Sequence, residues 1–170
     1  MSKYIVPENN SLKKEIEELI RLCKKAEEEY GENSSIFAQG IEENEMTDWE
    51  EKNGITIPES YKEWLRFSAL CKIRQTLAMF NPPKEFHSKY VPEDYIVIGS
   101  MIGDGEIVCF SKETGEFVRF YNGRENGRVN NFKIVLKEIN SHMRGDNLFT
   151  PERKAEILAK LKKMRENGEL

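Results

Sequence analysis

The sequence has no long apolar stretch and no recognisable leader. None of its apolar runs approaches the ~18 to 20 residues that a helix needs to span a bilayer. The first ten residues lack the apolar segment that follows a basic start in a secretory signal. We therefore expect a cytoplasmic protein that does not interact with membranes. The 170 residues, of which 38% are hydrophobic, are enough for one ordinary core.

Cysteine and histidine are also scarce. Cys23, Cys71 and Cys109 are odd in number and contain no C-x-x-C pair, a pattern typical of buried thiols in a reducing compartment. His87 and His142 stand in no motif, although nucleophilic catalysis needs a histidine in reach of a Ser or Cys. Zinc would require His and Cys ligands in close pairs. We expect no catalytic residue, no metal and no cofactor, and hence no enzyme.

The glycines that follow an apolar run near residue 99 do not form a phosphate loop. Gly99, Gly103 and Gly105 lack the G-x-G-x-x-G spacing, and the next element is a predicted strand instead of a helix. Asp104 and Glu106 are too few to match the oxygen ligands of an EF-hand. A tight turn is the interpretation that we favour.

Charge is unevenly distributed along the chain. Residues 1–50 hold 13 acidic and 6 basic side chains, whereas residues 51–170 hold 17 acidic and 20 basic ones. An acidic surface repels nucleic acid and suits a basic protein partner, and solvated helix faces are the alternative interpretation. Arg119, Arg124 and Arg128, near Phe120 and Tyr121, are too sparse for a nucleic-acid interface.

Three helices are predicted before residue 70. Ser11–Tyr30 predicts an amphipathic helix that Asn10 or Ser11 caps and Gly31 ends. A short helix is expected to begin at Thr47, with Glu50 as its capping-box partner, Trp49 as its apolar anchor and Gly54 as its end. Pro58 then opens a third helix whose apolar stripe includes Tyr61, Trp64 and Leu65.

The middle of the chain reads as short strands. The predicted strands are Lys72–Phe80, Tyr95–Gly99, Glu106–Phe110 and Glu116–Tyr121, separated by a break at 81–83, a turn at 103–105 and a turn at 112–115. The last two strands form a β-hairpin, and Asn122–Asn130 is expected to be a polar loop. A helix follows from Phe132 to Met143. After a linker, the tail from Pro151 to Asn167 forms a final helix, which packs either on the domain or on a second copy.

The stretch from Glu50 to Leu65 resembles the signature of the SUKH superfamily. This group contains the Smi/Knr cell-wall assembly regulators and many bacterial immunity proteins. Its motif, E-x-x-x-G-x-x-L-P-x-x-Y-x-x-F-L, is matched here by Glu50, Gly54, Pro58, Tyr61 and Leu65, with Ile57 and Trp64 at the two substituted positions. An apolar-I-G step at Ile98-Gly99 and the pair Asn131-Phe132 extend the resemblance over residues 36–143. The N-G-G step that often follows the motif is replaced at residues 68–71.

The resemblance implies an α+β fold with a twisted, mostly antiparallel central sheet flanked by helices. We divide the chain into an N-terminal amphipathic helix (1–35), a SUKH-like core (36–144) and a linker with a C-terminal helix (145–170). The expected function is a bacterial immunity protein that binds and neutralises a cognate toxin domain of nuclease type. The alternatives are a regulatory or scaffold module in cell-wall assembly or signalling and, third, an unrecognised hydrolase.

Two sets of residues are assigned from this interpretation. The structural residues of the motif are Glu50, Gly54, Pro58, Tyr61, Trp64 and Leu65. The expected contacts to the protein toxin are Glu42, Glu43, Glu45, Asp48, Trp49, Asp104 and Glu106, since acidic side chains would attract a basic nuclease cleft. We expect no nucleic-acid partner, and a monomer or a weak homodimer.

Overall fold

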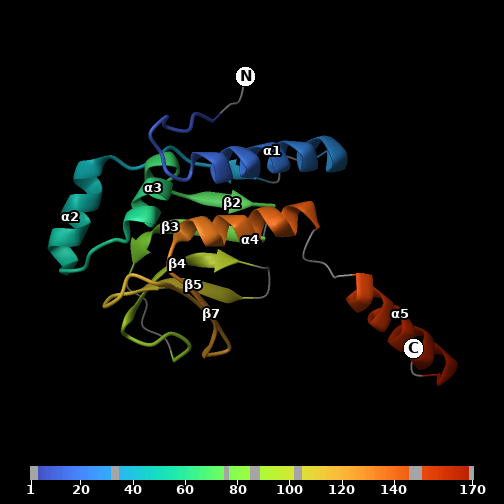
Figure 1. The fold of residues 1–170 in the computed structure, drawn as a ribbon. Helices are drawn as coiled ribbons and strands as arrows, with labels where there is room; N and C mark the ends of the chain where they lie inside the picture. Colours follow the sequence, from blue (N-terminus) through green and yellow to red (C-terminus); the bar gives the residue numbers. More distant parts are fainter. Residues whose placement is uncertain are drawn as a thin grey trace. The chain divides into compact units, whose positions relative to one another are not determined.

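Helices and an antiparallel sheet account for most of the described chain, which confirms the predicted α+β class (Figure 1). The computed structural model describes residues 4–31, 35–74, 77–84, 89–101, 105–145 and 151–168. Residues 1–140 and 141–170 form two separate compact units. The helices are α1 (Lys13–Tyr30), α2 (Glu43–Asn53), α3 (Glu59–Phe67), α4 (Phe132–Arg144) and α5 (Pro151–Glu166).

The first unit is built on one sheet whose strands follow one another in chain order, from β1 to β7. The strands are β1 (Ile36–Phe37), β2 (Cys71–Ile73), β3 (Ala78–Lys84), β4 (Tyr95–Met101), β5 (Glu106–Ser111), β6 (Phe117–Tyr121) and β7 (Arg124–Val129). Every neighbouring pair is antiparallel. We call the face on which α3 and α4 pack the inner face, and the opposite face the outer face.

Aromatic side chains form the centre of the core between α3, α4 and the sheet. Phe132, the first residue of α4, has no exposed surface, and its ring centroid lies 4.9 Å from that of Tyr61 and 5.1 Å from that of Phe80. Trp64 and Phe117 complete the cluster at 5.7 and 5.4 Å from Phe132. Edge-to-face packing at these distances adds to the free energy of burial. The predicted burial of the α3 stripe is therefore confirmed.

The predicted first helix is confirmed as α1, and Gly31 ends it as predicted, but it starts at Lys13 with Leu12 at the N-cap instead of Asn10 or Ser11. The Asn10 side-chain oxygen accepts the Leu12 amide at 2.9 Å, and Gly31 ends the helix at φ 71°. The side-chain amide nitrogen of Asn10 also donates to the backbone carbonyl of Glu63 in α3 at 2.7 Å. The side-chain amide of Asn140 in α4 donates to the carbonyl of Glu15 in α1 at 3.0 Å. Both hydrogen bonds hold α1 within the first unit.

The start of the second helix was predicted wrongly. Helix α2 begins at Glu43, and Thr47 lies inside it, where its hydroxyl donates to the Glu43 carbonyl at 3.0 Å. Glu50 does not return to Thr47 as a capping-box partner, because its carboxylate reaches forward to the segment before α3. The residue that anchors α2 is Met46, which is 2% exposed. The end of the helix is as predicted, with Gly54 in the left-handed conformation at φ 65°.

The predicted strand Lys72–Phe80 is in fact a hairpin of β2 and β3. The break expected at Asn81–Pro83 is also wrong, because these residues lie inside β3. Proline has no amide hydrogen and is tolerated in a strand where the ladder is irregular. The pairing of β3 with β4 shifts register between Phe80 and Lys84, which leaves room for the two prolines.

The polar loop predicted at Asn122–Asn130 contains the edge strand β7. Asn122 and Gly123 both have positive φ, 49° and 75°, and connect the paired residues Tyr121 and Arg124. This is the geometry of a two-residue hairpin turn, for which Asn-Gly is a strong sequence signal. The polar composition of the segment masked that signal, although charged side chains are common on edge strands.

The remaining predicted elements are confirmed with small changes of length. Strand β4 continues two residues past Gly99, and β5 one residue past Phe110. The hairpin of β5 and β6 turns at Gly115, at φ 71°. Of the predicted turn at 103–105, Gly105 has φ 84° and the other two residues lie outside the described residues. Helix α4 begins at Phe132, where the Asn131 side chain accepts the Lys133 amide at 2.8 Å.

The second unit contains α5, as the sequence predicts. Leu158 and Leu161 on this helix are 66% and 43% exposed. The prediction that this helix packs on the domain or on a second copy stays untested. No helix of the described residues combines the length and apolarity required to cross a membrane.

Candidate functional site

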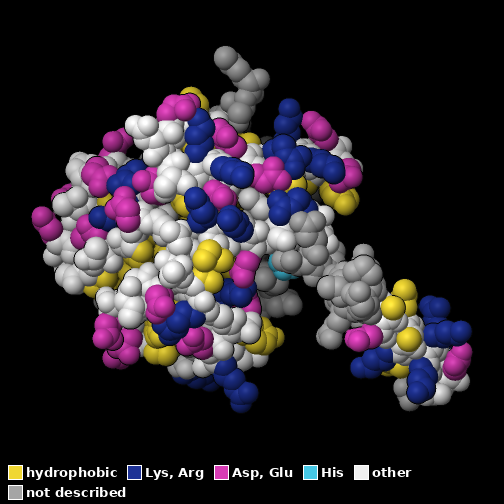
Figure 2. All heavy atoms as spheres, in the orientation of Figure 1, with side chains coloured by type: hydrophobic (Ala, Val, Ile, Leu, Met, Phe, Trp, Pro, Cys, Tyr) yellow, Lys and Arg dark blue, Asp and Glu magenta, His cyan; other side chains and the backbone are white. Residues whose placement is uncertain are grey.

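Helix α2 carries most of the acidic side chains predicted to contact a partner. Glu42, Glu43, Glu45 and Asp48 are all exposed, and Glu51 on the next turn is exposed as well. Lys52 is the only basic side chain of the helix. Figure 2 shows acidic side chains over the part of the molecule where Figure 1 places α2. We call these five carboxylates the α2 acidic surface.

Trp49 lies half-buried on the same helix. The other tryptophan, Trp64, has no exposed surface and belongs to the aromatic core. Part of the Trp49 side chain is therefore available to a partner beside the carboxylates. An aromatic side chain that is partly exposed among charged ones can provide the apolar contact of an interface.

The acidic surface is joined to α3 through Arg66. The Arg66 guanidinium lies 3.0 Å from the Glu43 carboxylate, 2.8 Å from Glu59 and 3.2 Å from Glu63. One cation thus links α2 to two carboxylates of α3 and partly neutralises Glu43. The carboxylates of Glu45 and Asp48 form no ion pair with any described residue, so a partner protein could pair with both.

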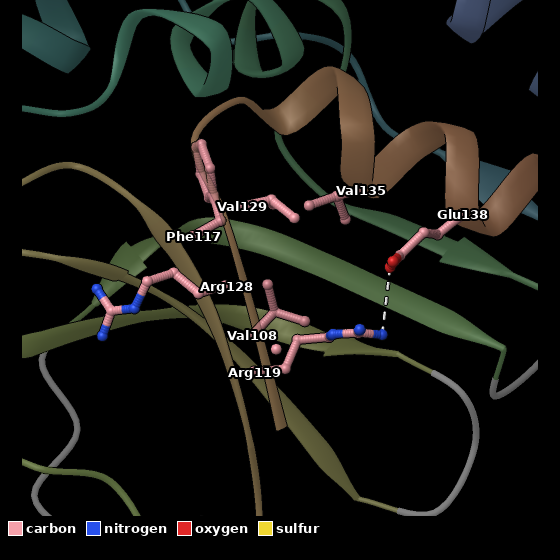
Figure 3. Close-up of a pocket in the computed structure, with 8 residues that line it drawn as sticks. Val108, Phe117, Arg119, Arg128, Val129, Val135 and Glu138 are labelled. Carbon is pink, nitrogen blue, oxygen red and sulfur yellow. Dashed lines mark ion pairs between the residues drawn. The ribbon is translucent and has the colours of Figure 1, made fainter. Parts of the chain in front are cut away.

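Glu106 occupies a different position from the α2 residues. It is 8% exposed, and its carboxylate accepts a hydrogen bond from the Asn126 amide on β7. Arg119 on β6 lies 3.6 Å from Glu106 and 3.2 Å from Glu138 on α4 (Figure 3). Glu106 is therefore engaged inside the protein, between the sheet and α4. Asp104, the neighbouring predicted contact, lies outside the described residues.

The sequence reasoning missed the cluster of Arg119, Asn126 and Glu138 around Glu106. These residues are 13 to 32 positions away from Glu106 along the chain. Successive side chains of a strand point to opposite faces of the sheet, so Arg119 lies on the same face as Phe117. Because Phe117 belongs to the aromatic core, this spacing could have indicated that Arg119 faces the core. An arginine there needs a carboxylate partner.

A small cavity lies beside this cluster, between β5, β6, β7 and α4 (Figure 3). It encloses about 10 Å³ and is lined by Val108, Phe117, Arg119, Gly127, Arg128, Val129, Val135 and Glu138. This volume corresponds to about one water molecule. An organic cofactor or substrate would not fit into it.

Arg128, which the sequence placed in a thin basic patch, is held by carboxylates. Its guanidinium contacts Glu116 at 2.8 Å and Glu125 at 2.9 Å, and donates to the Tyr95 hydroxyl at 2.8 Å. The hydrogen bond from Arg128 lowers the pKa of the Glu116 carboxyl, and a second one from Thr114 adds to this effect. The positive charge of Arg128 is thus compensated by its own neighbours.

The motif residues serve to hold α2, α3 and the sheet together. Tyr61, Trp64 and Leu65 have no exposed surface, and the Tyr61 hydroxyl donates to the Asn81 carbonyl in β3. Gly54 ends α2, and Pro58 stands at the N-cap of α3. These motif residues therefore stabilise the fold, and the surface that contacts a partner is expected to consist of other residues.

The described residues provide no metal site. Among them, no group of three or more His, Cys, Asp or Glu side chains could hold an ion. Cys23, Cys71 and Cys109 are free and buried, as predicted. His142 is half-buried in α4, and His87 lies outside the described residues.

Comparison with known proteins adds one result to this geometry. A search of the curated proteins found no match to the chain. The model of the SMI1 / KNR4 family (SUKH-1) matches residues 40–139, a range that runs from the segment before α2 to α4. This family contains immunity proteins and regulatory proteins, which are generally not catalysts. The match covers more than half of the sequence and includes every residue of the motif, so the chain belongs to the SMI1/KNR4 (SUKH-1) family.

Proposed function

We propose that this protein is a bacterial immunity protein that binds a cognate toxin domain and blocks its activity in the cytoplasm. Membership in the SUKH-1 family, which includes immunity proteins, carries the proposal. The partner is a protein, and the α2 acidic surface favours one with a basic functional site, such as a nuclease domain.

Electrostatics is the physical reason for placing the contact on α2. Its five exposed carboxylates lie within three turns of one helix, and Lys52 is the one basic side chain of that helix. Complementary charge accelerates association and suppresses wrong partners more than it adds affinity. Fast association matters for a protein that must capture a toxin before the toxin reaches its substrate.

Trp49 is proposed as the apolar part of the same contact. Interfaces gain most of their affinity from a few aromatic or arginine side chains, and the contacts that surround these side chains exclude water. Glu45 lies one turn before Trp49 on α2, and Asp48 directly precedes it in the chain. Asp104 and Glu106 stay predicted contacts, and the Glu106 interactions with Asn126 and Arg119 favour a supporting role.

The test uses the toxin domain encoded beside the gene for this protein. We expect the purified chain to form a complex with that domain and to protect cells that express it. The double substitution Glu45→Lys with Asp48→Lys should slow association at low salt by roughly tenfold or more, because steering is lost. Glu28→Lys with Glu29→Lys, on exposed positions of α1, makes the same change of charge elsewhere and serves as the matched control.

Two outcomes separate the proposals. If no complex forms and no protection is seen, the immunity function is wrong, and the regulatory or scaffold role in cell-wall assembly or signalling takes its place. If the complex forms but both double variants behave alike, the function stands and the α2 contact is wrong. Light scattering of the free chain then tests the proposed monomer or weak homodimer.

A further inference from the structure

Among the described residues, apolar packing covers the outer face of the sheet over only part of its width. On β4, β5 and β6, this face is covered by a second apolar cluster, which consists of Val91, Val97, Cys109, Val118 and Phe120. Tyr95 and Ile107 pack against this cluster. On β1, β2 and β3, the side chains that alternate with the buried core residues are exposed instead. The part of the outer face formed by β1, β2 and β3 therefore presents its described side chains to solvent.

Four residues define this region, which we call the β1–β3 patch. The register pairs Ile36 with Lys72 and Lys72 with Met79, so the three form one row across the strands. Ile36 is 54% exposed and Met79 is 37% exposed. Leu70, two positions before Lys72, is 46% exposed. An antiparallel sheet that faces water normally presents polar side chains there, and three of these four are apolar.

Among the described residues of β1–β3 and the turn that follows β2, the charged side chains are all basic. Lys72 and Lys84 are the charged residues of β1–β3, and Arg74 follows β2 with its guanidinium 5.3 Å from the ring of Tyr30. No described carboxylate forms an ion pair with Lys72 or Lys84. The whole chain has a net charge of −4. An uncompensated lysine between exposed apolar side chains is thus complementary to an apolar segment that carries carboxylates.

We propose that the β1–β3 patch is a docking surface for an acidic amphipathic helix of a partner protein. A helix suits the site because the patch lies on the face of the sheet, where side chains and not backbone groups are presented. A helix about 10 Å in diameter covers three strands spaced about 4.8 Å apart. Its apolar stripe contacts Ile36, Leu70 and Met79, and a carboxylate at the border of the stripe pairs with Lys72.

This inference does not rest on the proposed function. The α2 acidic surface attracts a basic partner, whereas the β1–β3 patch attracts an acidic one, so the two surfaces differ in charge and in apolar content. A toxin bound at α2 and a helix bound at the patch would be two separate partners.

The experiment uses a synthetic amphipathic helix with leucines at positions i, i+3, i+4 and i+7 and glutamates on both sides of that stripe. A second peptide has lysines in place of the glutamates. Each is titrated into the ¹⁵N-labelled full chain. We expect the glutamate peptide to give saturable shifts at the amides of residues 70–73 and 78–80, and the lysine peptide to bind at least about fivefold more weakly.

Variants show whether the patch is responsible. Lys72→Glu should weaken binding of the glutamate peptide at least about fivefold and reverse the preference between the peptides. Lys25→Glu, on an exposed position of α1, is the control for charge. Met79→Ser should also weaken binding, whereas Leu161→Ser, which removes an exposed leucine from α5, should not. Circular dichroism confirms that each variant is folded.

Three results would overturn the proposal. The first is the absence of saturable shifts with the glutamate peptide at concentrations up to about 1 mM. The second is an unchanged affinity of the Lys72→Glu variant. The third is a set of shifted amides that maps to α2 or α5 instead of β2 and β3.

Discussion

The Glu50 carboxylate accepts a hydrogen bond from the Ile57 amide at 2.7 Å, across the turn that joins α2 to α3. The same carboxylate lies 3.0 Å from the Lys62 ammonium one turn into α3. The side chains of Glu50 and Lys62 are only 20% and 14% exposed. The Glu50 side chain of α2 therefore stabilises both the segment that leads into α3, through Ile57, and the first turns of α3, through Lys62.

Substitutions at Glu50 should separate these two interactions. Glu50→Ala removes both and is expected to lower the free energy of unfolding by about 1–3 kcal/mol, since the Ile57 amide loses its acceptor. Glu50→Gln keeps an oxygen for Ile57 and loses only the charge that pairs with Lys62, so it should cost less than Glu50→Ala. Urea unfolding measures both values. Equal losses for the two variants would show that the ion pair with Lys62 dominates.

The hydroxyl of Tyr61 should contribute to stability through β3. It donates to the Asn81 carbonyl, next to the register shift where that strand contains two prolines. Tyr61→Phe keeps the ring in the core and leaves the carbonyl without this donor, which should cost about 1–3 kcal/mol. Tyr121→Phe, at a 43% exposed position, is the control and should be nearly neutral. A neutral Tyr61→Phe would show that another donor replaces the hydroxyl.

Two glycines should be intolerant of any side chain for reasons of space. A Cβ on Gly40 would lie 2.0 Å from the Arg66 carbonyl oxygen, and one on Gly99 would lie 2.0 Å from that of Met79. Gly40→Ala and Gly99→Ala should each cost more than about 3 kcal/mol, because backbone atoms must move.

Gly54 provides a matched comparison in which space is available. It has φ 65° and no atom within 4 Å of an added Cβ, so only the left-handed conformation opposes a side chain. Gly54→Ala should cost about 1–2 kcal/mol. Thermal or urea unfolding of the three variants gives the order, and a Gly54→Ala variant less stable than the other two would contradict it.

The buried thiols should make the fold sensitive to alkali. Burial raises the pKa of Cys71 and of Cys109 from 9.0 to about 12. Below pH 9 the thiols are protonated in both the folded and the unfolded chain, so stability is unaffected by them. Between pH 9 and 12 only the unfolded chain loses these protons, so stability falls as the pH rises.

Unfolding in urea at pH 8 and pH 10 measures this loss. Near pH 10 each thiol should cost about 1 kcal/mol, as one pKa unit corresponds to 1.36 kcal/mol. Cys109→Ala should reduce the loss between the two pH values, whatever its effect on stability at pH 8. A loss that is the same in this variant as in the parent would exclude Cys109 as a source. The thiols should also react slowly with a disulfide reagent until urea is added.

Local signals in the sequence predict the helices well. The apolar positions of α1, α3 and α4 repeat with the helical period, and Gly31, Pro58 and Asn131 mark ends or starts through short-range backbone geometry. The same kind of signal was present at Asn122-Gly123, where a two-residue hairpin turn opens β7. Strand β7 could therefore have been predicted from Asn122-Gly123, despite the polar composition of the residues that follow.

Other features depended on contacts between distant residues. The capping-box pattern of Thr47 and Glu50 is real in the sequence, but the Glu50 carboxylate binds Ile57 and Lys62 once α3 is in place. The prolines of β3 are accommodated by the register with β4, which no local pattern reveals. For the candidate site, the exposure of Glu45 and Asp48 follows from an acidic helix, whereas the burial of Glu106 depends on Arg119 and Asn126.

The sequence by itself determined that the chain is an α+β protein of the SUKH type, with an acidic N-terminal portion and a motif that orders two helices. Spacing, glycine conformation and charge are properties of neighbouring residues, so they can be recognised without a structure. Tertiary structure alone decided that the Glu106 carboxylate is buried and that, among the described residues, Ile36, Lys72 and Met79 form one row on the outer face of the sheet. The reason is that folding brings together residues far apart along the chain, such as Ile36 and Lys72 in the strand register or Glu106 and Asn126 through a hydrogen bond.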